Sequence, residues 1–373
     1  MRVILAGGGT AGHINPALAI ASYIKKQLPD TEILYIGAKN GMEETLVPKA
    51  GFDFKSIRIS GFKRSFSPSA VKHNAVTLKR AVTAQSEAKK IIKEFAPDIC
   101  IGTGGYVSGP VLRAAAKMKI KTVIHEQNAF PGVTTKILSK YVDKVMLAVW
   151  DAKDHIKGRE DFVLTGNPVR EEIIYADKAS ARKKMNLDQR PLVLSFGGSL
   201  GARKLNEAVA ELIARSGKDK RYYHIHATGK SGYETFKTML AEKCGYDYNK
   251  CENIDIREYI YDMPDCIAAA DLVISRAGAI SLSEIQAQGK PSVLVPSPYV
   301  AENHQYHNAM ALVNKKAASM IEEKDLTGET LIKTVDKMLA DRQALEEYSA
   351  NVKKTAILDS NKRIFDVIMS LVK

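Results

Sequence analysis

The chain has 373 residues, of which 45% are hydrophobic and 26% are charged; this balance is typical of a globular protein and excludes a collagen, a coiled coil and low-complexity disorder. Lys and Arg exceed Asp and Glu by 55 to 42, which gives a formal net charge of +13. Such an excess favours an anionic partner: nucleic acid, an acidic membrane surface or a phosphorylated substrate. The four cysteines form no C-x-x-C pair, so we expect a reducing compartment and no metal or redox motif.

Short β-rich runs alternate with longer helical stretches in the first half of the chain. The pattern predicts strands at 3–6, 32–37, 98–102 and 121–125. It predicts helices at 14–27, 69–95 and 111–119. Strands that alternate with helices indicate right-handed βαβ units and a parallel sheet. The first apolar run is too short for a signal peptide, and no run approaches the roughly 20 apolar residues of a membrane-spanning helix. We therefore expect a cytosolic protein that can bind at a membrane surface.

The same pattern restarts in the second half. Residues 192–201 read LVLSFGGSLG and repeat the strand-then-glycine arrangement of residues 3–12, VILAGGGTAG. Further strands are predicted at 222–227, 254–258, 271–275 and 292–296. The C-terminal stretch, residues 342–373, is predicted to be helical. We interpret the chain as an α/β protein with two Rossmann-like, doubly wound parallel-sheet domains that face a cleft. The domains are expected at 1–167 plus a C-terminal helix at about 355–373, and at 168–354.

Three glycine-rich turns follow predicted strands, at residues 7–13, 102–109 and 197–203. Glycine lets a backbone approach a phosphate closely, and the helix that follows offers free N–H groups. Each turn alone is equally well a tight strand-to-helix connection, but three at equivalent places favour anionic ligands in the cleft. The first turn also matches G-x-G-x-x-G. Because the second predicted strand ends without an acidic residue, at residues 37–40, a nicotinamide nucleotide is disfavoured.

The segment 271–296 combines a strand, the turn at residues 276–278 and a helix at 279–288. The start of this helix offers N–H groups to a sugar or a diphosphate. Glu284 lies one turn further on, where a carboxylate can accept two hydrogen bonds from the cis-diol of a ribose. A solvated acid on the helix surface is the alternative interpretation.

Nine segments, in order, resemble the MurG family, whose members transfer N-acetylglucosamine to the undecaprenyl-diphosphate-linked muramyl peptide of peptidoglycan. The segments are GGGTAGHINPALAIA, YIGAKNGMEETLVPKAGF, GTGGYVSGPV, HEQNAFPGVTTK, GNPVR, GGSLGAR, YIYDM, SRAGAISLSE and ENHQYHNA. The resemblance implies a two-domain GT-B fold. It also implies an inverting transfer from UDP-N-acetylglucosamine to the C4 hydroxyl of the acceptor, which converts lipid I to lipid II. A UDP-N-acetylglucosamine epimerase of the same two-domain plan and a non-catalytic nucleotide-sugar module remain as alternatives.

The resemblance also implies roles for matched positions. The donor contacts it implies are Ser199 and Arg170 for the diphosphate, Ile260 for the uracil, Ala279 and Ile280 as helix N–H donors, Glu284 for the ribose, Gln305 for the sugar hydroxyls, and Thr10, Ala11, Gly12 and Asn128 from the first domain. The acceptor diphosphate would meet Gly104, Gly105 and Tyr106. The first turn departs from the family's usual G-G-T-G-G-H at Ala11, where a glycine is usual.

A single displacement at an anomeric carbon needs one general base. His13 is the candidate, because an imidazole titrates near neutral pH and this one follows the first glycine turn; a loop-bracing role is the alternative. Glu126 of the segment HEQN is the second candidate, with a buried structural carboxylate as its alternative. No D-x-D motif lies in a suitable loop. We therefore expect no cofactor and no obligatory protein-bound metal, with helix N-termini and Arg170 stabilising the leaving UDP.

Residues 61–95 carry eight Lys and Arg side chains against two Glu, with apolar residues interleaved. This composition predicts a peripheral docking surface for the anionic cytoplasmic leaflet that holds the acceptor's polyprenyl tail. Lys72, Lys79 and Arg80 are the candidate contacts. An amphipathic helix whose apolar face enters the core is the alternative. No nucleic-acid recognition motif accompanies the basic charge, so nucleic acid is not an expected partner.

Overall fold

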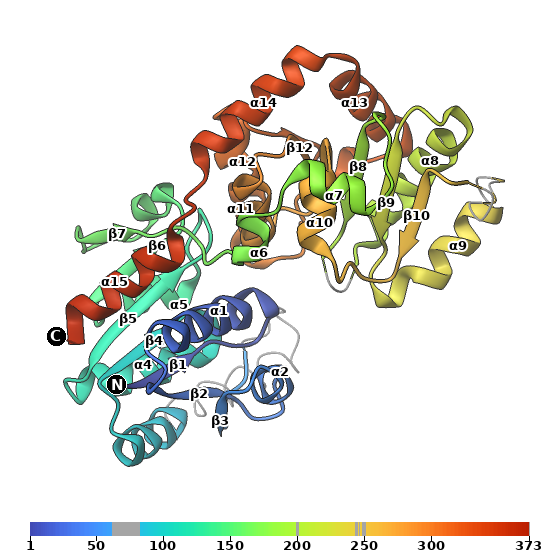
Figure 1. The fold of residues 1–373 in the computed structure, drawn as a ribbon. Helices are drawn as coiled ribbons and strands as arrows, with labels where there is room; N and C mark the ends of the chain where they lie inside the picture. Colours follow the sequence, from blue (N-terminus) through green and yellow to red (C-terminus); the bar gives the residue numbers. More distant parts are fainter. Residues whose placement is uncertain (62–82, 199–200, 243–244, 246, 248–250, 373) are drawn as a thin grey trace. The chain divides into compact units, whose positions relative to one another are not determined.

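The computed structural model describes residues 1–61, 83–198, 201–242, 245, 247 and 251–372. The chain forms two compact units. The first comprises Met1–Pro168 and Asp359–Lys373, and the second comprises Val169–Leu358. Each unit is built on a parallel sheet of its own (Figure 1). The division expected from the sequence, after residue 167, lies beside the observed boundary.

Seven parallel strands form the sheet of the first unit, in the order β3-β2-β1-β4-β5-β6-β7. They are β1 (Arg2–Ala6), β2 (Glu32–Ala38), β3 (Asp53–Ile57), β4 (Ile99–Gly102), β5 (Lys121–Glu126), β6 (Lys144–Leu147) and β7 (Phe162–Leu164). The chain winds outward from β1 in one direction and from β4 in the other, so the strand order reverses between these two neighbours. The carboxyl ends of β1 and β4 are therefore where a sheet of this kind binds its ligand.

Helices cover both faces of this sheet. They are α1 (Ala11–Gln27), α2 (Glu43–Lys49), the helical residues 83–95, α4 (Gly105–Lys117), α5 (Val133–Leu138), the 3₁₀ helix η1 (Trp150–His155) and α15 (Ser360–Val372). Side chains alternate along β1, as the period of a strand requires. Val3 and Leu5 pack with α1 and α15 on one face. Ile4 and Ala6 pack with α4 and the helical residues 83–95 on the other.

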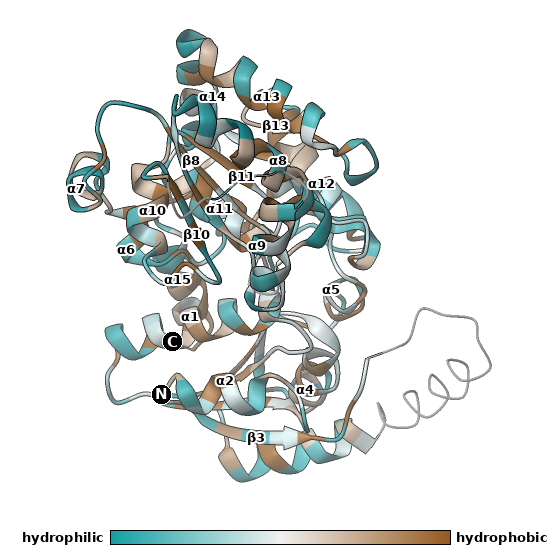
Figure 2. Cartoon of the chain, turned by 90° about the vertical axis from the view of Figure 1, so that its right-hand side faces the viewer, coloured by the Kyte–Doolittle hydropathy of each residue, from teal (hydrophilic) through white to brown (hydrophobic). Residues whose placement is uncertain are grey.

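The C-terminal stretch is two helices, α14 (Arg342–Thr355) and α15, which belong to different units. The prediction of one helical stretch is therefore wrong at residues 356–359, where the chain passes from the second unit back to the first. Ile364 and Ile368 are buried in the same cluster as the apolar face of α1, and Figures 1 and 2 both show α15 alongside α1. This packing anchors the C-terminus on the first unit.

Six parallel strands form the sheet of the second unit, in the order β10-β9-β8-β11-β12-β13. They are β8 (Leu192–Phe196), β9 (Tyr223–Ala227), β10 (Ile254–Arg257), β11 (Leu272–Ser275), β12 (Ser292–Leu294) and β13 (Ser319–Met320). The order reverses between β8 and β11, so the second unit repeats the topology of the first. Its ligand is expected at the carboxyl ends of these two strands.

The helices of the second unit also lie on both faces of its sheet. They are α6 (Glu171–Ile174), α7 (Lys178–Lys184), α8 (Arg203–Asp219), η2 (Lys230–Gly232), α9 (Tyr233–Glu242), α10 (Met263–Ala269), α11 (Ala279–Ala287), η4 (Ala301–Asn303), α12 (His304–Val313), η5 (Glu323–Asp325), α13 (Gly328–Ala340) and α14. Leu192 and Leu194 pack with α10, α11 and α12, and Val193 packs with α8 and α13. Figure 2 shows apolar strands in brown among helices that carry both hydrophilic and hydrophobic residues.

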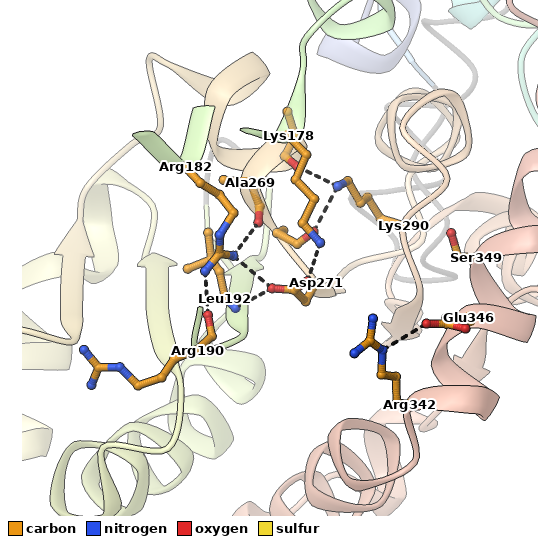
Figure 3. A network of polar contacts seen from close by, with 12 residues as sticks. Lys178, Arg182, Arg190, Leu192, Ala269, Asp271, Lys290, Arg342, Glu346 and Ser349 are labelled. Carbon is orange, nitrogen blue, oxygen red and sulfur yellow. Dashed lines mark hydrogen bonds and ion pairs between the residues drawn. The ribbon is translucent and has the colours of Figure 1, made fainter. Parts of the chain in front are cut away.

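A polar network joins several elements of the second unit (Figure 3). The carboxylate of Asp271 accepts hydrogen bonds from Lys178 at 2.5 Å, from Arg182 at 3.1 Å and from the N–H of Leu192 at 2.8 Å. The buried ammonium of Lys290 donates to two carbonyls at the end of α10, at 2.6 and 2.9 Å. Burial lowers the pKa of Lys290 to about 7. The network holds β8, α10 and β12 in place around the strand that leads into α11.

Two buried histidines of β9 flank Ser195 of β8. The Ser195 hydroxyl lies 2.7 Å from Nε2 of His224 and 2.8 Å from Nδ1 of His226. Within the part of the chain that the structure describes, Nδ1 of His224 and Nε2 of His226 have no hydrogen-bond partner. Burial lowers the pKa of His224, and it lowers the pKa of His226 to about 3, because a charged ring would lose its hydration there. The Ser195 carbonyl, 3.2 Å from Nδ1 of His226, opposes the second shift only in part.

We expect these histidines to destabilise the second unit in acid. The unfolded chain binds their protons near pH ~6.5, whereas in the folded chain His226 stays neutral down to about pH 3. The free energy of unfolding should therefore fall as the pH drops below about 6.5, by up to about 1.4 kcal/mol per pH unit for each histidine. Urea denaturation followed by circular dichroism measures this slope. The variant His226→Phe should have a shallower slope, and an unchanged slope would contradict the assignment.

Candidate active site

The first glycine turn of the first unit joins β1 to α1 and places His13 in the first turn of that helix. The Nδ1 atom of His13 lies 3.0 Å from the carbonyl oxygen of Thr103 and 3.2 Å from Oε1 of Gln127. Both neighbours are acceptors, so Nδ1 carries the proton and the neutral ring has its lone pair on Nε2. The hydroxyl of Thr103 in turn donates to the His13 carbonyl at 2.7 Å. A half-buried imidazole held in this tautomer can accept a proton at Nε2.

The second glycine turn follows β4 and packs directly on the first. Gly104 and Gly105 have φ values of 99° and 73°, which disfavour any side chain. A Cβ at Gly104 would lie 2.9 Å from Nδ1 of His13, and one at Gly105 would lie 2.0 Å from the Gly8 carbonyl oxygen. The N–H of Gly104 is already bonded to the hydroxyl of Ser108 at 3.1 Å. The turn thus positions His13, and Gly104 offers no free N–H to an acceptor diphosphate.

Tyr106 lies at the start of α4, with its ring against Gly9. Burial raises the pKa of the Tyr106 phenol, and the carboxylate of Glu43 raises it further. Glu43 was not identified from the sequence. It is fully buried at the start of α2, and its Oε1 accepts a hydrogen bond from the N–H of Ala38 at 2.9 Å. Its Oε2 has no partner among the residues that the structure describes. A Cβ at Gly8 would lie 2.3 Å from Oε1 of Glu43, so this carboxylate braces the first glycine turn.

Glu126, the second candidate base, ends β5 and is buried. Its Oε1 accepts hydrogen bonds from the backbone N–H and the side-chain amide of Asn128, at 3.1 and 3.0 Å, and its Oε2 accepts from the N–H of Gly132 at 3.1 Å. These contacts hold the loop after β5 in place. They leave the carboxylate engaged with its own loop, and they orient Asn128. Thr10 and Gly12, the neighbouring positions on the first glycine turn, are exposed.

In the second unit, Arg170 and Glu284 form an ion pair, with Nη2 3.1 Å from Oε1. The Glu284 side chain on α11 is 12% exposed and that of Arg170 is 51% exposed. Burial raises the pKa of Glu284, and the guanidinium of Arg170 opposes this shift. Arg170 therefore lies with the predicted ribose-binding carboxylate, and it is absent from the lining of the cavity described below.

A cavity of about 630 Å³ lies at the carboxyl end of the second sheet. Its lining includes Gly197, Gly198 and Gly201 of the third glycine turn, together with Gln305 of α12. The N–H of Ser297 donates to Oε1 of Gln305 at 2.9 Å, which orients the amide. Ser199, the predicted diphosphate contact, lies outside the described residues.

The remaining predicted donor contacts lie on two neighbouring segments. Ala279 and Ile280 form the first turn of α11 after the cap residue Gly278. Ile260 is buried in the loop between β10 and α10. It is flanked by the tyrosines at 259 and 261, which are 48% and 88% exposed and whose ring centroids are 5.0 Å apart. Among the described residues, no group of three or more His, Cys, Asp and Glu side chains is placed to hold a metal ion.

Curated relatives match the chain from end to end. A protein of Acetivibrio thermocellus is 48% identical over 100% of this chain and 99% of its own length, and one of Bacillus cytotoxicus is 45% identical over 100% of both. Both are named UDP-N-acetylglucosamine--N-acetylmuramyl-(pentapeptide) pyrophosphoryl-undecaprenol N-acetylglucosamine transferase. The crystal structure of Acinetobacter baumannii MurG is 27% identical, covers 99% of both chains and superposes with a TM-score of 0.78. The chain belongs to the MurG family.

Two further comparisons agree with the architecture of the MurG family. The N-terminal domain of glycosyltransferase family 28 matches residues 3–147, and the C-terminal domain of that family matches residues 192–364. The two-sheet fold is the GT-B arrangement expected from the sequence. A UDP-N-acetylglucosamine 2-epimerase of Neisseria meningitidis shares this fold, with a TM-score of 0.65 over 99% of this chain and 100% of its own, but it is 13% identical. The likeness to the epimerase is one of fold alone.

Proposed function

We propose that this chain is a hexosyltransferase that moves N-acetylglucosamine from UDP-N-acetylglucosamine to an undecaprenyl-diphosphate-linked muramyl peptide in peptidoglycan synthesis. The observation that carries the proposal is the 48% identity over the full length to a relative with this name. The site chemistry agrees with it, because one unit carries an imidazole whose Nε2 can accept a proton, and the other carries a glycine-lined cavity and, on α11, the buried carboxylate of Glu284. The finer proposal is an inverting attack by the C4 hydroxyl of the acceptor.

The reaction we propose is a single displacement. The C4 hydroxyl oxygen forms a bond to the anomeric carbon of the donor, and Nε2 of His13 takes the hydroxyl proton. The bond from the anomeric carbon to the diphosphate oxygen breaks, and UDP leaves with the electron pair. The hydrogen bond from Nδ1 to Thr103 at 3.0 Å keeps the ring oriented and strengthens as the ring becomes positively charged. Glu126 supports the loop that carries Asn128.

The donor is proposed to bind mainly on the second unit. Glu284 would accept hydrogen bonds from the ribose hydroxyls, and the backbone of Ile260 would meet the uracil edge. The N–H groups of Ala279 and Ile280 would face the donor at the start of α11, and Gln305 would bond the sugar hydroxyls. Thr10, Ala11 and Gly12 would approach the sugar from the first unit, and Ser199 the diphosphate. On the acceptor side, Gly105 and Tyr106 would receive the diphosphate.

The experiment that tests this function is product analysis with radiolabelled UDP-N-acetylglucosamine, with and without a short-chain lipid acceptor. We expect label to enter the lipid fraction only when the acceptor is present. An epimerase would convert the nucleotide sugar in the absence of any acceptor, and a binding module would leave it unchanged. Either of these results would contradict the proposed function.

We also propose that the transfer requires no bound metal ion, because fixed N–H groups and protein cations can stabilise the diphosphate as it leaves. Adding EDTA to the transfer assay should therefore leave most of the activity. A complete loss that Mg²⁺ restores would contradict the proposal. Calcium chelation by EGTA serves as the control for effects of the chelator on the lipid acceptor.

We propose that the chain docks on an anionic membrane surface at the cytoplasmic face through Lys72, Lys79 and Arg80, which lie outside the described residues. Among the described helices, none combines the length and the apolar character needed to cross a bilayer. In the adjoining helical residues 83–95, Ala88 and Ile92 are buried in the core. These residues therefore follow the alternative interpretation, an amphipathic helix whose apolar face enters the core. The docking proposal therefore rests on the sequence of residues 62–82.

Sedimentation with vesicles tests the docking proposal. Binding to vesicles of anionic lipid should weaken as salt rises, since each basic residue near such a surface contributes about 1 kcal/mol that salt screens. Reversing Lys72, Lys79 and Arg80 to Glu should remove most of the binding and leave transfer to a soluble short-chain acceptor intact. Equal binding to neutral and anionic vesicles would contradict the assignment.

A further inference from the structure

Two adjoining cavities of the second unit share three lining residues, Lys204, Tyr299 and Glu323. The larger is the cavity of about 630 Å³ that contains the third glycine turn and Gln305. The smaller has about 350 Å³ and is lined in part by Pro296 and Tyr306. The shared residues make the two a continuous hollow, and Lys204 lies where they meet.

Seven charged side chains line the two cavities, and six of them are paired with one another. The pairs are Arg203 with Glu207 at 2.9 Å, Lys324 with Glu322 at 3.1 Å, and Arg276 with Glu323. The seventh is Lys204, which has no acidic partner within 4.0 Å among the described residues. Because the opposite charges within each of the three pairs cancel, the lining carries a net charge of +1, which is the charge of the Lys204 ammonium. An anionic ligand would find its compensating cation here.

The position of Lys204 in the chain suits a diphosphate. Lys204 lies in the first turn of α8, directly after the third glycine turn. In that turn a Cβ at Gly201 would lie 2.1 Å from the carbonyl oxygen of Thr228, so the turn sits tightly on the end of β9. The side chain of Lys204 is exposed, and its four-carbon stem gives the ammonium a wide reach. Arg170, the cation expected for the diphosphate, forms an ion pair with Glu284 and does not line this hollow.

We infer that Lys204 is a further donor-binding residue, whose ammonium contacts the diphosphate of the nucleotide sugar and stabilises the charge that collects on UDP as it leaves. This inference rests on the proposed function. When the bond to the anomeric carbon breaks, the electron pair stays on the diphosphate oxygen. A cation that contacts that oxygen lowers the free energy of the transition state more than that of the bound donor, because the negative charge on the oxygen grows as the bond breaks.

Titration calorimetry with UDP and with uridine tests the inference on Lys204→Met, which removes the charge from an exposed side chain and keeps its length. The dissociation constant for UDP should rise about tenfold, the lower end for a hydrogen bond to a charged group, and it should depend less on salt than that of the wild type. The affinity for uridine, which has no phosphate, should stay the same. Lys204→Arg should retain most of the UDP affinity.

Lys218→Met is the matched control, because Lys218 is an exposed lysine in the last turn of the same helix; it should bind UDP as the wild type does. Arg203→Met tests the neighbouring cation and should have the smaller effect, since Arg203 already pairs with Glu207. Wild-type UDP affinity in Lys204→Met, an equal loss for uridine, or a loss confined to Arg203→Met would each overturn the inference while leaving the proposed function intact. Failure of the wild type to bind UDP would overturn both.

Discussion

Replacing His13 by alanine should lower kcat by about 10²–10⁴-fold and leave the affinity for UDP close to that of the wild type. The reason is that the proton moves only in the transition state, whereas the nucleotide is held by the second unit in the proposed function. Nδ1 of His13 is committed as a donor to Thr103 at 3.0 Å, so Nε2 is the atom available to the acceptor hydroxyl. Steady-state transfer kinetics and UDP titration measure the two effects separately.

His13→Asn separates catalysis from loop bracing. An asparagine amide keeps a hydrogen-bond donor near the position of Nδ1, so the contact with Thr103 is retained while the basic nitrogen is lost. We expect this variant to be as slow as His13→Ala. Activity near the wild-type level in His13→Asn would make His13 a loop-bracing residue and would move the role of base to another group.

Replacing Glu284 by glutamine should weaken UDP binding by about 10- to 100-fold, since a hydrogen bond to a charged group contributes about 1.5–3 kcal/mol. Uridine should lose affinity by the same factor, because the proposed contact is with the ribose. The side chain of Glu284 is 12% exposed, so little water is present to replace the lost acceptor. Titration with both ligands gives the two ratios, and unchanged affinities would place Glu284 away from the ribose.

Arg170→Met is the matched control for this experiment. It removes the partner at 3.1 Å and leaves the carboxylate in place. If Arg170 only orients Glu284, UDP and uridine should lose affinity equally and by less than in Glu284→Gln. A loss specific to UDP would return Arg170 to the diphosphate, as the sequence predicted, and would make it a second cation beside Lys204.

The central strands of both sheets, β1, β4, β8 and β11, could be predicted because they are short apolar runs. The strands β3, β6, β7 and β13 were not predicted; three of them are edge strands, and β6 is an inner strand of only four residues. Three of the five residues of Asp53–Ile57 are polar, and the three residues of Phe162–Leu164 are only partly buried, so neither strand is a buried apolar run. The helix α4 was predicted to begin at residue 111, but it begins at Gly105. The glycine-rich residues 102–109 were interpreted as a turn. The structure shows that Gly104 and Gly105 are required because the start of α4 approaches the first glycine turn closely.

The sequence indicates candidate residues that lie at the end of a predicted strand or just after it. It does not indicate which distant residues pack against one another. His13 could be identified because it comes after the turn that follows β1, and Glu126 because it is the last residue of β5, so both lie at the carboxyl ends of strands of the first sheet. The pairing of Arg170 with Glu284 joins residues 114 positions apart, and nothing in either segment indicates the other. Nothing in the sequence distinguishes Lys204 from the other lysines. It differs from the other charged residues of the hollow only because they form three ion pairs and it has no acidic partner among the described residues.

The most direct test of the central claim is NMR analysis of the product formed from UDP-N-acetylglucosamine and a soluble short-chain lipid acceptor. The donor sugar is α-linked to the diphosphate. A single displacement assisted by one base should therefore give a β-linked N-acetylglucosamine on the C4 oxygen of the muramyl residue, with UDP released in equal amount. An α-linked product, a different acceptor hydroxyl, or an epimerised nucleotide sugar with no change in the acceptor would contradict the assignment.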